Sequence, residues 1–262
     1  MRIKRAFAAA FLALFACASG PSAQAIVGGE KVSQPWAAAF IKQNSGAPVE
    51  KRTYCSGVLV NPRWVMTAAH CPIAPGDTVV IGRATLASSQ GEKRTVARIE
   101  RMPHSNRYCP SKSWELCDVA LVRLNAASAQ PTLALAGSQV LREWGEGTAA
   151  RAYGYGAASA ATADRSSGYL KRAHVSIDDF RANNHTLFAS GPRTAVCYGD
   201  SGGPLVVSTS RGPRLVAVVR ARVGHDQTSC TRGDSQSYTK VGYRGASNNS
   251  KPFLWITHIL GT

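Results

Sequence analysis

Short apolar or alternating segments separated by turn residues run along most of this chain, and they constrain its fold more than any other feature of the sequence. Each is bounded by Pro, Gly, Asn or Ser, a pattern typical of β-strands. The segments are 37–41, 54–60, 78–81, 95–100, 119–124, 149–155, 170–177, 204–207, 215–219 and 236–241. A helical period appears only near the end, at residues 252–260. The sequence therefore predicts an all-β protein with a short C-terminal helix.

The first 25 residues have the organisation of a secretory signal peptide. Residues 1–5 are cationic, and residues 6–16 form an apolar run that is too short to span a bilayer. A Gly-Pro pair follows, and residues 23–25 read Ala-Gln-Ala, a small-x-small site for signal peptidase. An N-terminal membrane anchor and a lipidated Cys17 are the alternatives. We expect an exported protein, secreted or periplasmic, that begins at Ile26 and has no transmembrane segment.

Three short motifs supply the groups needed for nucleophilic catalysis. A Cys-Tyr-Gly-Asp-Ser-Gly-Gly-Pro motif places Ser201 between glycines and next to an aspartate, where backbone N–H groups can point at a developing oxyanion. A Thr-Ala-Ala-His-Cys motif provides His70 as a general base, and an Asp-Val-Ala-Leu-Val-Arg-Leu motif begins with Asp118, a carboxylate that can orient that base. Singly, these residues have ordinary explanations as a turn serine, a core histidine and a strand-entry cap. Together they predict a Ser-His-Asp triad.

The order His70, Asp118, Ser201 resembles that of the chymotrypsin-like serine proteases of the trypsin family. An Ile-Val-Gly-Gly segment that starts at Ile26 and a Gly-Tyr-Gly segment at residues 154–156 resemble further elements of that family. The alanine-rich composition and the signal peptide suggest a secreted bacterial member. The resemblance implies peptide-bond hydrolysis through an acyl-enzyme, with a protein or peptide as substrate.

The resemblance also implies a fold of two antiparallel six-stranded Greek-key β-barrels followed by a short helix. A chain of 262 residues, 44% of them hydrophobic, is long enough to bury such a core. Residues 26–130 are expected to form the N-terminal barrel with the histidine and the aspartate. Residues 131–262 are expected to form the C-terminal barrel with the serine and the helix. The stretch 126–136 is interpreted as the linker.

The resemblance assigns roles to residues around the nucleophile. The N–H groups of Gly199 and Ser201 are implied to form the oxyanion hole. The α-ammonium of Ile26 is implied to turn inward and form a buried ion pair with Asp200 that orders this loop. Most relatives are cut after Arg or Lys, whereas Ala25 precedes the cut here. We hypothesise that signal peptidase itself makes the active N-terminus; a short propeptide removed by another protease is the alternative.

The pocket residues depart from the family pattern. The position six residues before the nucleophile is Ala195, beside Val196, so no buried carboxylate is expected for an Arg or Lys of the substrate. Arg220 and Arg222 flank an alanine where the family has Ser-Trp-Gly, and Gln236 stands near another usual glycine. Two interpretations follow: a shortened apolar pocket for Ala or Val, or an arginine that pairs with Glu or Asp of the substrate. A preference for Leu or Phe, or a blocked pocket, is a further alternative.

Of seven cysteines, Cys17 lies in the predicted signal, which leaves an even number in the exported chain, as in disulfide-linked proteins. The expected pairs are Cys55–Cys71, Cys109–Cys117 and Cys197–Cys230. Local geometry and the family resemblance favour the first pair, the resemblance implies the third, and the second is what remains. A zinc site is the rival interpretation, but the sequence has no Cys-x-x-Cys pair or His-x-x-x-His spacing. We expect no metal and no cofactor.

The formal charge of the chain is +16, and it falls to +13 when the three basic residues of the signal are removed. Such a charge is compatible with binding to anionic surfaces or polymers. The basic residues are dispersed, however, and no nucleic-acid motif is present, so a scattered solvated surface is the plainer explanation. We expect a monomer that binds no specific nucleic acid. The alternative function is a catalytically idle cationic binding protein on a protease scaffold.

Overall fold

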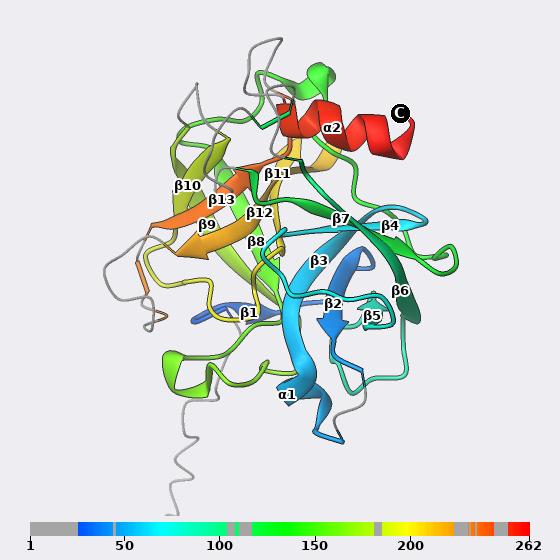
Figure 1. Ribbon diagram of the computed structural model, residues 1–262. Helices are drawn as coiled ribbons and strands as arrows, with labels where there is room; N and C mark the ends of the chain where they lie inside the picture. Colours follow the sequence, from blue (N-terminus) through cyan, green and yellow to red (C-terminus); the bar gives the residue numbers. More distant parts are fainter. Residues whose placement is uncertain are drawn as a thin grey trace, which may run out of the picture.

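Two β-barrels lie side by side, and the chain passes from the first to the second near its middle (Figure 1). The structure is a computed structural model that describes residues 26–43, 46–103, 108–109, 117–180, 185–222, 230, 232–233, 235–243 and 251–262. Strands dominate these residues, and the expectation of an all-β fold with two six-stranded antiparallel barrels is confirmed.

The first barrel closes from six antiparallel strands in the order β2-β3-β4-β7-β6-β5. The strands are β2 (Ala37–Ile41), β3 (Thr53–Asn61), β4 (Trp64–Thr67), β5 (Thr78–Ile81), β6 (Glu92–Arg101) and β7 (Ala120–Leu124). Every residue of β2 and β4 is buried, whereas most of β6 is not. Apolar side chains such as Phe40, Leu59 and Leu121 fill the interior, because burying them removes the most apolar surface from water. A one-turn helix, α1 (Val49–Arg52), precedes β3.

The second barrel closes because β8 pairs with both β9 and β11. Its strands are β8 (Ala149–Gly154), β9 (Lys171–Asp179), β10 (Thr186–Ser190), β11 (Pro204–Thr209), β12 (Gly212–Arg222) and β13 (Gln236–Lys240), and two short 3-10 helices lie at Ser138–Val140 and Ala160–Thr162. Buried and more exposed residues alternate along β9, as expected for a strand with one face on a core.

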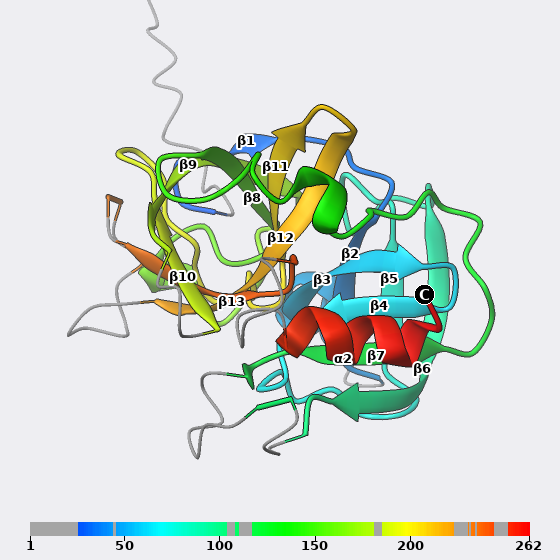
Figure 2. The same cartoon turned by 90° about the horizontal axis from the view of Figure 1, so that it is seen from above.

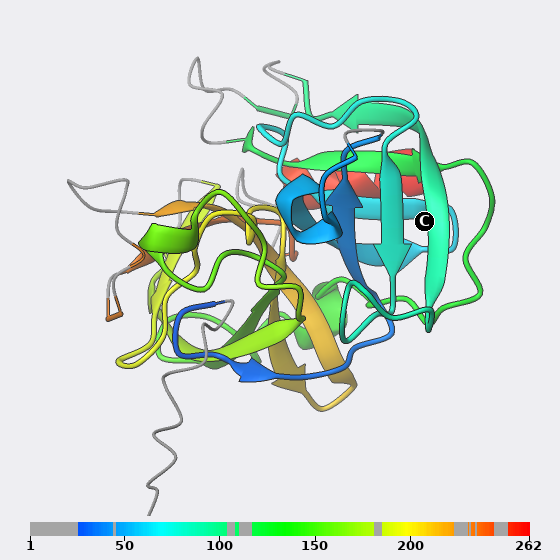
Figure 3. The same cartoon turned by 90° about the horizontal axis from the view of Figure 1, so that it is seen from below.

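Both ends of the described chain reach the opposite barrel. Strand β1 (Glu30–Lys31) pairs with β9 of the second barrel before the chain enters β2 of the first (Figure 3). Helix α2 (Lys251–Leu260) follows the second barrel but lies beside β4 and β7 of the first (Figure 2). Trp255 and Ile256 of this helix are buried in the same apolar cluster as the core of the first barrel. No helix among the described residues is long and apolar enough to span a membrane.

The ten expected strand segments all fall on strands, with ends that differ by a few residues. The sequence interpretation missed β1, β4 and β10. Strand β4 has no alternation, since all four residues are buried, and it runs directly into the histidine motif. A short apolar run of this kind cannot be assigned by periodicity alone.

Candidate active site

The loop after β4 brings His70 to Asp118, which lies just before β7. Asp118 is fully buried, and its carboxylate accepts two hydrogen bonds from His70: the backbone N–H reaches Oδ1 at 2.7 Å, and Nδ1 reaches Oδ2 at 2.6 Å. Because a carboxylate only accepts, Nδ1 carries the proton and Nε2 is the nitrogen left to accept one. A disulfide between Cys55 of β3 and Cys71 fixes the loop next to the histidine.

All five carbonyl oxygens of residues 197–201 accept a hydrogen bond from the protein. The donors, in order from the Cys197 to the Ser201 carbonyl, are Asp200 N (3.0 Å), Ala157 N (2.6 Å), Ser56 Oγ (2.8 Å), Gly203 N (2.9 Å) and Ser56 N (2.9 Å). Within the part of the chain that the structure describes, the N–H groups of Gly199 and Ser201 donate no hydrogen bond. The loop is therefore held through its carbonyls, and two neighbouring amides are left for another acceptor.

Ser201 lies against the histidine loop without a hydrogen bond to it. Cys71 Sγ is 3.9 Å from the Ser201 carbonyl oxygen, so the residue after His70 contacts the backbone of Ser201. The hydrogen bonds found between described residues do not include one from Ser201 Oγ to His70. Such contacts are often long without substrate and shorten in the reactive complex.

Asp200 is wholly enclosed by the second barrel. Its carboxylate accepts hydrogen bonds from the N–H groups of Gly156 and Cys197, each at 2.8 Å. Burial raises the pKa of Asp200 to about 7, although these hydrogen bonds and the charge of Lys171 act in the opposite direction. A Cβ at Gly154 would overlap Oδ1 of Asp200, and one at Gly156 would lie 2.6 Å from its Cγ. The Gly-Tyr-Gly segment is therefore needed to make room for this carboxyl group.

Ile26 is also fully buried, and the backbone beside it forms part of the second barrel. Val27 and Ala195 exchange two backbone hydrogen bonds, at 2.9 and 3.1 Å. The φ of Ile26 is +39°, a left-handed value that a β-branched residue rarely adopts. Among the described contacts there is none between Ile26 and Asp200, and in this chain the Ile26 nitrogen is part of a peptide bond.

Lys171 of β9 is a buried lysine whose charge acts on Asp200. It is only 1% exposed, its Nζ donates to the Gly29 carbonyl at 3.4 Å, and its cross-strand partner is Gly154. Burial, with a contribution from Lys31, lowers the pKa of Lys171 to about 8, and Asp200 acts to raise it. The sequence offered no signal for this residue, because a lysine in a strand is usually solvated.

The expected pocket residues fall in two segments, one before the loop at residues 197–201 and the other on β12 and β13. Ala195 and Val196 are buried at 2% and 3% exposure, just before the nucleophile loop. Arg222 of β12 is the cross-strand partner of Gln236 of β13, which is 1% exposed. Arg220 Nε lies 3.4 Å from the hydroxyl of the residue after Gln236. Residues 223–229 lie outside the described residues.

The structure also contains the disulfides Cys109–Cys117 and Cys197–Cys230. Among the described residues, no cluster of three or more His, Cys, Asp or Glu side chains is arranged to hold a metal ion.

Comparison with known proteins decides the family. A family model described as Trypsin matches residues 26–244. The chain belongs to the trypsin family. Similar proteins include the tissue-type plasminogen activator of Rattus norvegicus (31% identity), the serine protease SP24D of Anopheles gambiae (28%) and kallikrein-11 of Homo sapiens (29%). These matches cover 80%, 82% and 80% of this chain and 41%, 77% and 73% of the respective relatives, so the chain spans less than half of the plasminogen activator.

The solved structure of human heparin binding protein resembles this trypsin-family chain with a TM-score of 0.66. The match covers 90% of this chain and 97% of that one at 23% identity, which supports the fold alone. The relatives named above are animal proteins, and they leave the expectation of a bacterial source untested.

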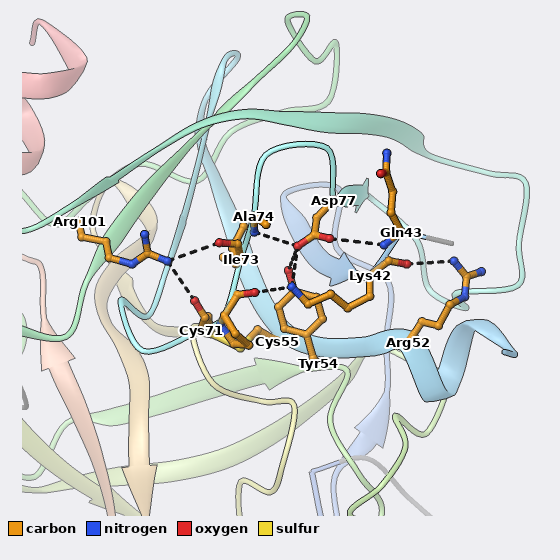
Figure 4. Close-up of polar contacts among 11 residues, drawn as sticks. Lys42, Gln43, Arg52, Tyr54, Cys55, Cys71, Ile73, Ala74, Asp77 and Arg101 are labelled. Atoms are coloured by element: carbon orange, nitrogen blue, oxygen red, sulfur yellow. Dashed lines mark hydrogen bonds and ion pairs between the residues drawn. A yellow bond between two sulfur atoms is a disulfide. The ribbon is translucent and has the colours of Figure 1, made fainter. Parts of the chain in front are cut away.

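The sequence of this trypsin-family protein gave no sign of a polar cluster that braces the histidine loop (Figure 4). Asp77 accepts hydrogen bonds from Lys42 Nζ (3.0 Å), the Tyr54 hydroxyl (2.8 Å) and the Ala74 N–H (2.9 Å). Burial acts to raise the pKa of Asp77, but these partners outweigh it and lower the pKa. Arg101 Nε donates to the carbonyl of the residue before His70 at 3.1 Å. The segment after the histidine is thereby tied to the ends of β2 and β3.

Proposed function

We propose that this protein is an exported serine endopeptidase in which Ser201, His70 and Asp118 form the catalytic triad. Ser201 Oγ attacks the scissile carbonyl carbon while His70 Nε2 takes its proton, and Asp118 holds the imidazole in the required tautomer. The proton then passes to the leaving amine as the C–N bond breaks, and a water molecule hydrolyses the acyl-enzyme. The two hydrogen bonds from His70 to Asp118 support this assignment.

The main support for the proposal is the hydrogen-bonding pattern of the backbone at residues 197–201. Its carbonyls are all engaged, while the N–H groups of Gly199 and Ser201 have no acceptor among the described residues. Two free amides, on the proposed nucleophile and on the residue two positions before it, suit the oxyanion of a tetrahedral intermediate, and removal of one such donor costs about 3–4 kcal/mol of transition-state stabilisation. A catalytically idle binding protein does not require free N–H groups at Gly199 and Ser201.

We further propose that the α-ammonium of Ile26 pairs with Asp200 once residues 1–25 are removed. The support is that Ile26 is buried, that Asp200 is enclosed, and that φ at Ile26 is unfavourable while the chain continues to Ala25. Cleavage removes this backbone restraint, since an N-terminal residue has no preceding carbonyl to clash with. The hypothesis that signal peptidase makes this cut predicts lower activity for a protein with one extra Met before Ile26.

For specificity, we propose a small aliphatic residue before the scissile bond. The buried side chains Ala195 and Val196 offer no charge, and the buried Gln236 narrows the space beside β13. An acidic preference through Arg222 is the second candidate, because this arginine and Gln236 are partners in the sheet.

The test is cleavage of a diverse peptide library by protein that begins at Ile26, with Ser201→Ala as the control. We expect cuts after Ala or Val that disappear in the variant. Cuts after Glu or Asp would indicate instead that Arg222 determines the specificity. Labelling of Ser201 by an organophosphonate requires a working triad and oxyanion hole, so folded protein that neither cuts nor reacts would establish the idle binding protein instead.

A further inference from the structure

We infer that Ser56 is a positioning residue for the oxyanion hole; this rests on the proposed function. Ser56 lies in β3 of the first barrel and is 1% exposed. Its hydroxyl donates to the Gly199 carbonyl at 2.8 Å and accepts the Tyr155 N–H at 2.9 Å. Its backbone N–H donates to the Ser201 carbonyl at 2.9 Å. One residue of the first barrel therefore holds both oxyanion-hole residues of the second.

The hydroxyl contact matters because Gly199 has no side chain to restrict its backbone. Its φ is +88°, a value that glycine adopts freely, so its own backbone does not fix the direction of its N–H. The peptide before Gly199 is held by the Tyr198 carbonyl, which accepts from Ala157 N at 2.6 Å. The carbonyl of the peptide after it is held by Ser56 Oγ. With the hydroxyl removed, the Gly199 carbonyl loses its donor, and the peptide between Gly199 and Asp200 keeps only the hydrogen bond from Asp200 N to the Cys197 carbonyl at 3.0 Å.

Ser56 also relates the oxyanion hole to the general base. It follows Cys55, whose disulfide with Cys71 fixes the loop that carries His70. The base and the oxyanion hole lie on different barrels. The disulfide and the Cys55–Ser56 peptide bond connect the loop of the base to Ser56, and the hydroxyl of Ser56 binds the Gly199 carbonyl. Geometry between such groups must hold within a fraction of an ångström for efficient catalysis.

The test compares hydroxyl-free and hydroxyl-retaining variants in protein that begins at Ile26. We expect Ser56→Ala to lower kcat about tenfold or more while KM changes less than about twofold, because the donor geometry serves the transition state. Ser56→Gly is a second hydroxyl-free variant that adds no bulk, for use where the alanine variant does not fold. Ser56→Thr keeps the hydroxyl and is expected to keep most of kcat.

Ser166→Ala is the matched control. The Ser166 hydroxyl is likewise buried, donates to the Tyr155 carbonyl and accepts the Gly168 N–H, but among the described residues it makes no hydrogen bond to residues 197–201. We expect its kcat to stay within about twofold of wild type at a similar loss of stability. Unchanged kcat in the hydroxyl-free variants, or an equal drop in Ser166→Ala, would overturn the inference alone. A wild-type protein that neither cleaves peptides nor reacts with the phosphonate would overturn the proposed function and this inference with it.

Discussion

Several residues of this site supply the space and the hydrogen bonds that a buried carboxyl group requires. Asp200 fits only because glycine stands at positions 154 and 156, so the Gly-Tyr-Gly segment is a consequence of the carboxyl group behind it. Such a requirement can be read from the sequence only with a known family in hand. The importance of Ser56 and Asp77 could not be predicted from the sequence at all, because nothing around them distinguishes them from ordinary strand and loop residues.

Gly154→Ala tests this relation directly. The new Cβ would overlap Oδ1 of Asp200, so we expect the free energy of unfolding to fall by about 1–3 kcal/mol. We also expect at least tenfold lower peptidase activity and a similar fold decrease in the rate of phosphonate labelling. Gly137→Ala is the control, because its Cβ would meet only the flexible Gln139 side chain. Equal behaviour of the two variants in urea unfolding and activity assays would contradict the argument.

At the scale of elements, we expect the N-terminal segment to change how the free energy of unfolding depends on pH. In the chain with residues 1–25 attached, burial raises the pKa of Asp200 from 3.8 to about 7, and we expect a similar value in protein with an extra Met before Ile26. Between those values the folded state keeps a proton that the unfolded chain has released, so the free energy of unfolding falls as pH rises. In protein that begins at Ile26, the new ammonium lowers this pKa and the fall is smaller.

The stability advantage of the trimmed protein should therefore grow between pH 4 and 7, by on the order of 3 kcal/mol. Denaturant unfolding of the two proteins at pH 4.5 and 7.5 measures it. Asp200→Asn in both backgrounds is the control and should remove the pH-dependent part of the difference. Parallel profiles for the trimmed and extended proteins would show that Ile26 does not pair with Asp200.

Helix α2 stabilises the molecule through one face. Ile256 is fully buried against the core of the first barrel, whereas Leu254 two residues earlier is 50% exposed. We expect Ile256→Ala to cost about 2–4 kcal/mol of unfolding free energy and Leu254→Ala less than about 0.5 kcal/mol. Similar thermal shifts for the two variants would mean that the helix does not contribute through packing.

For the whole molecule, the sequence predicted the architecture better than the fine structure of the site. The strand segments and the helix period followed from local patterns, and the proposed triad rests on three motifs. Strand β4 was missed because its four buried residues show no period. Ser56, Lys171 and Asp77 were missed because their partners are distant in sequence: the Ser56 hydroxyl, for example, joins residues 99 and 143 positions away.

Net charge is a property of the whole molecule. Without the predicted signal peptide the chain has a formal charge of +13, and we expect it to attract acidic peptides over distances comparable to the Debye length. We expect kcat/KM at low salt to be higher for a peptide flanked by Glu than for the same peptide flanked by Lys. The ratio should approach one as salt rises toward 1 M, and a ratio independent of salt would assign the preference to contacts in the site.

The exchange of end segments between the barrels has a consequence for the order in which the protein can be completed. Strand β1 lies on the second barrel, and α2, the last element of the described chain, covers part of the first. The strands of the first barrel are synthesised long before α2, so the apolar surface that Trp255 and Ile256 cover stays exposed until the helix has been made. A nascent chain without α2 therefore presents this surface to chaperones and to other chains.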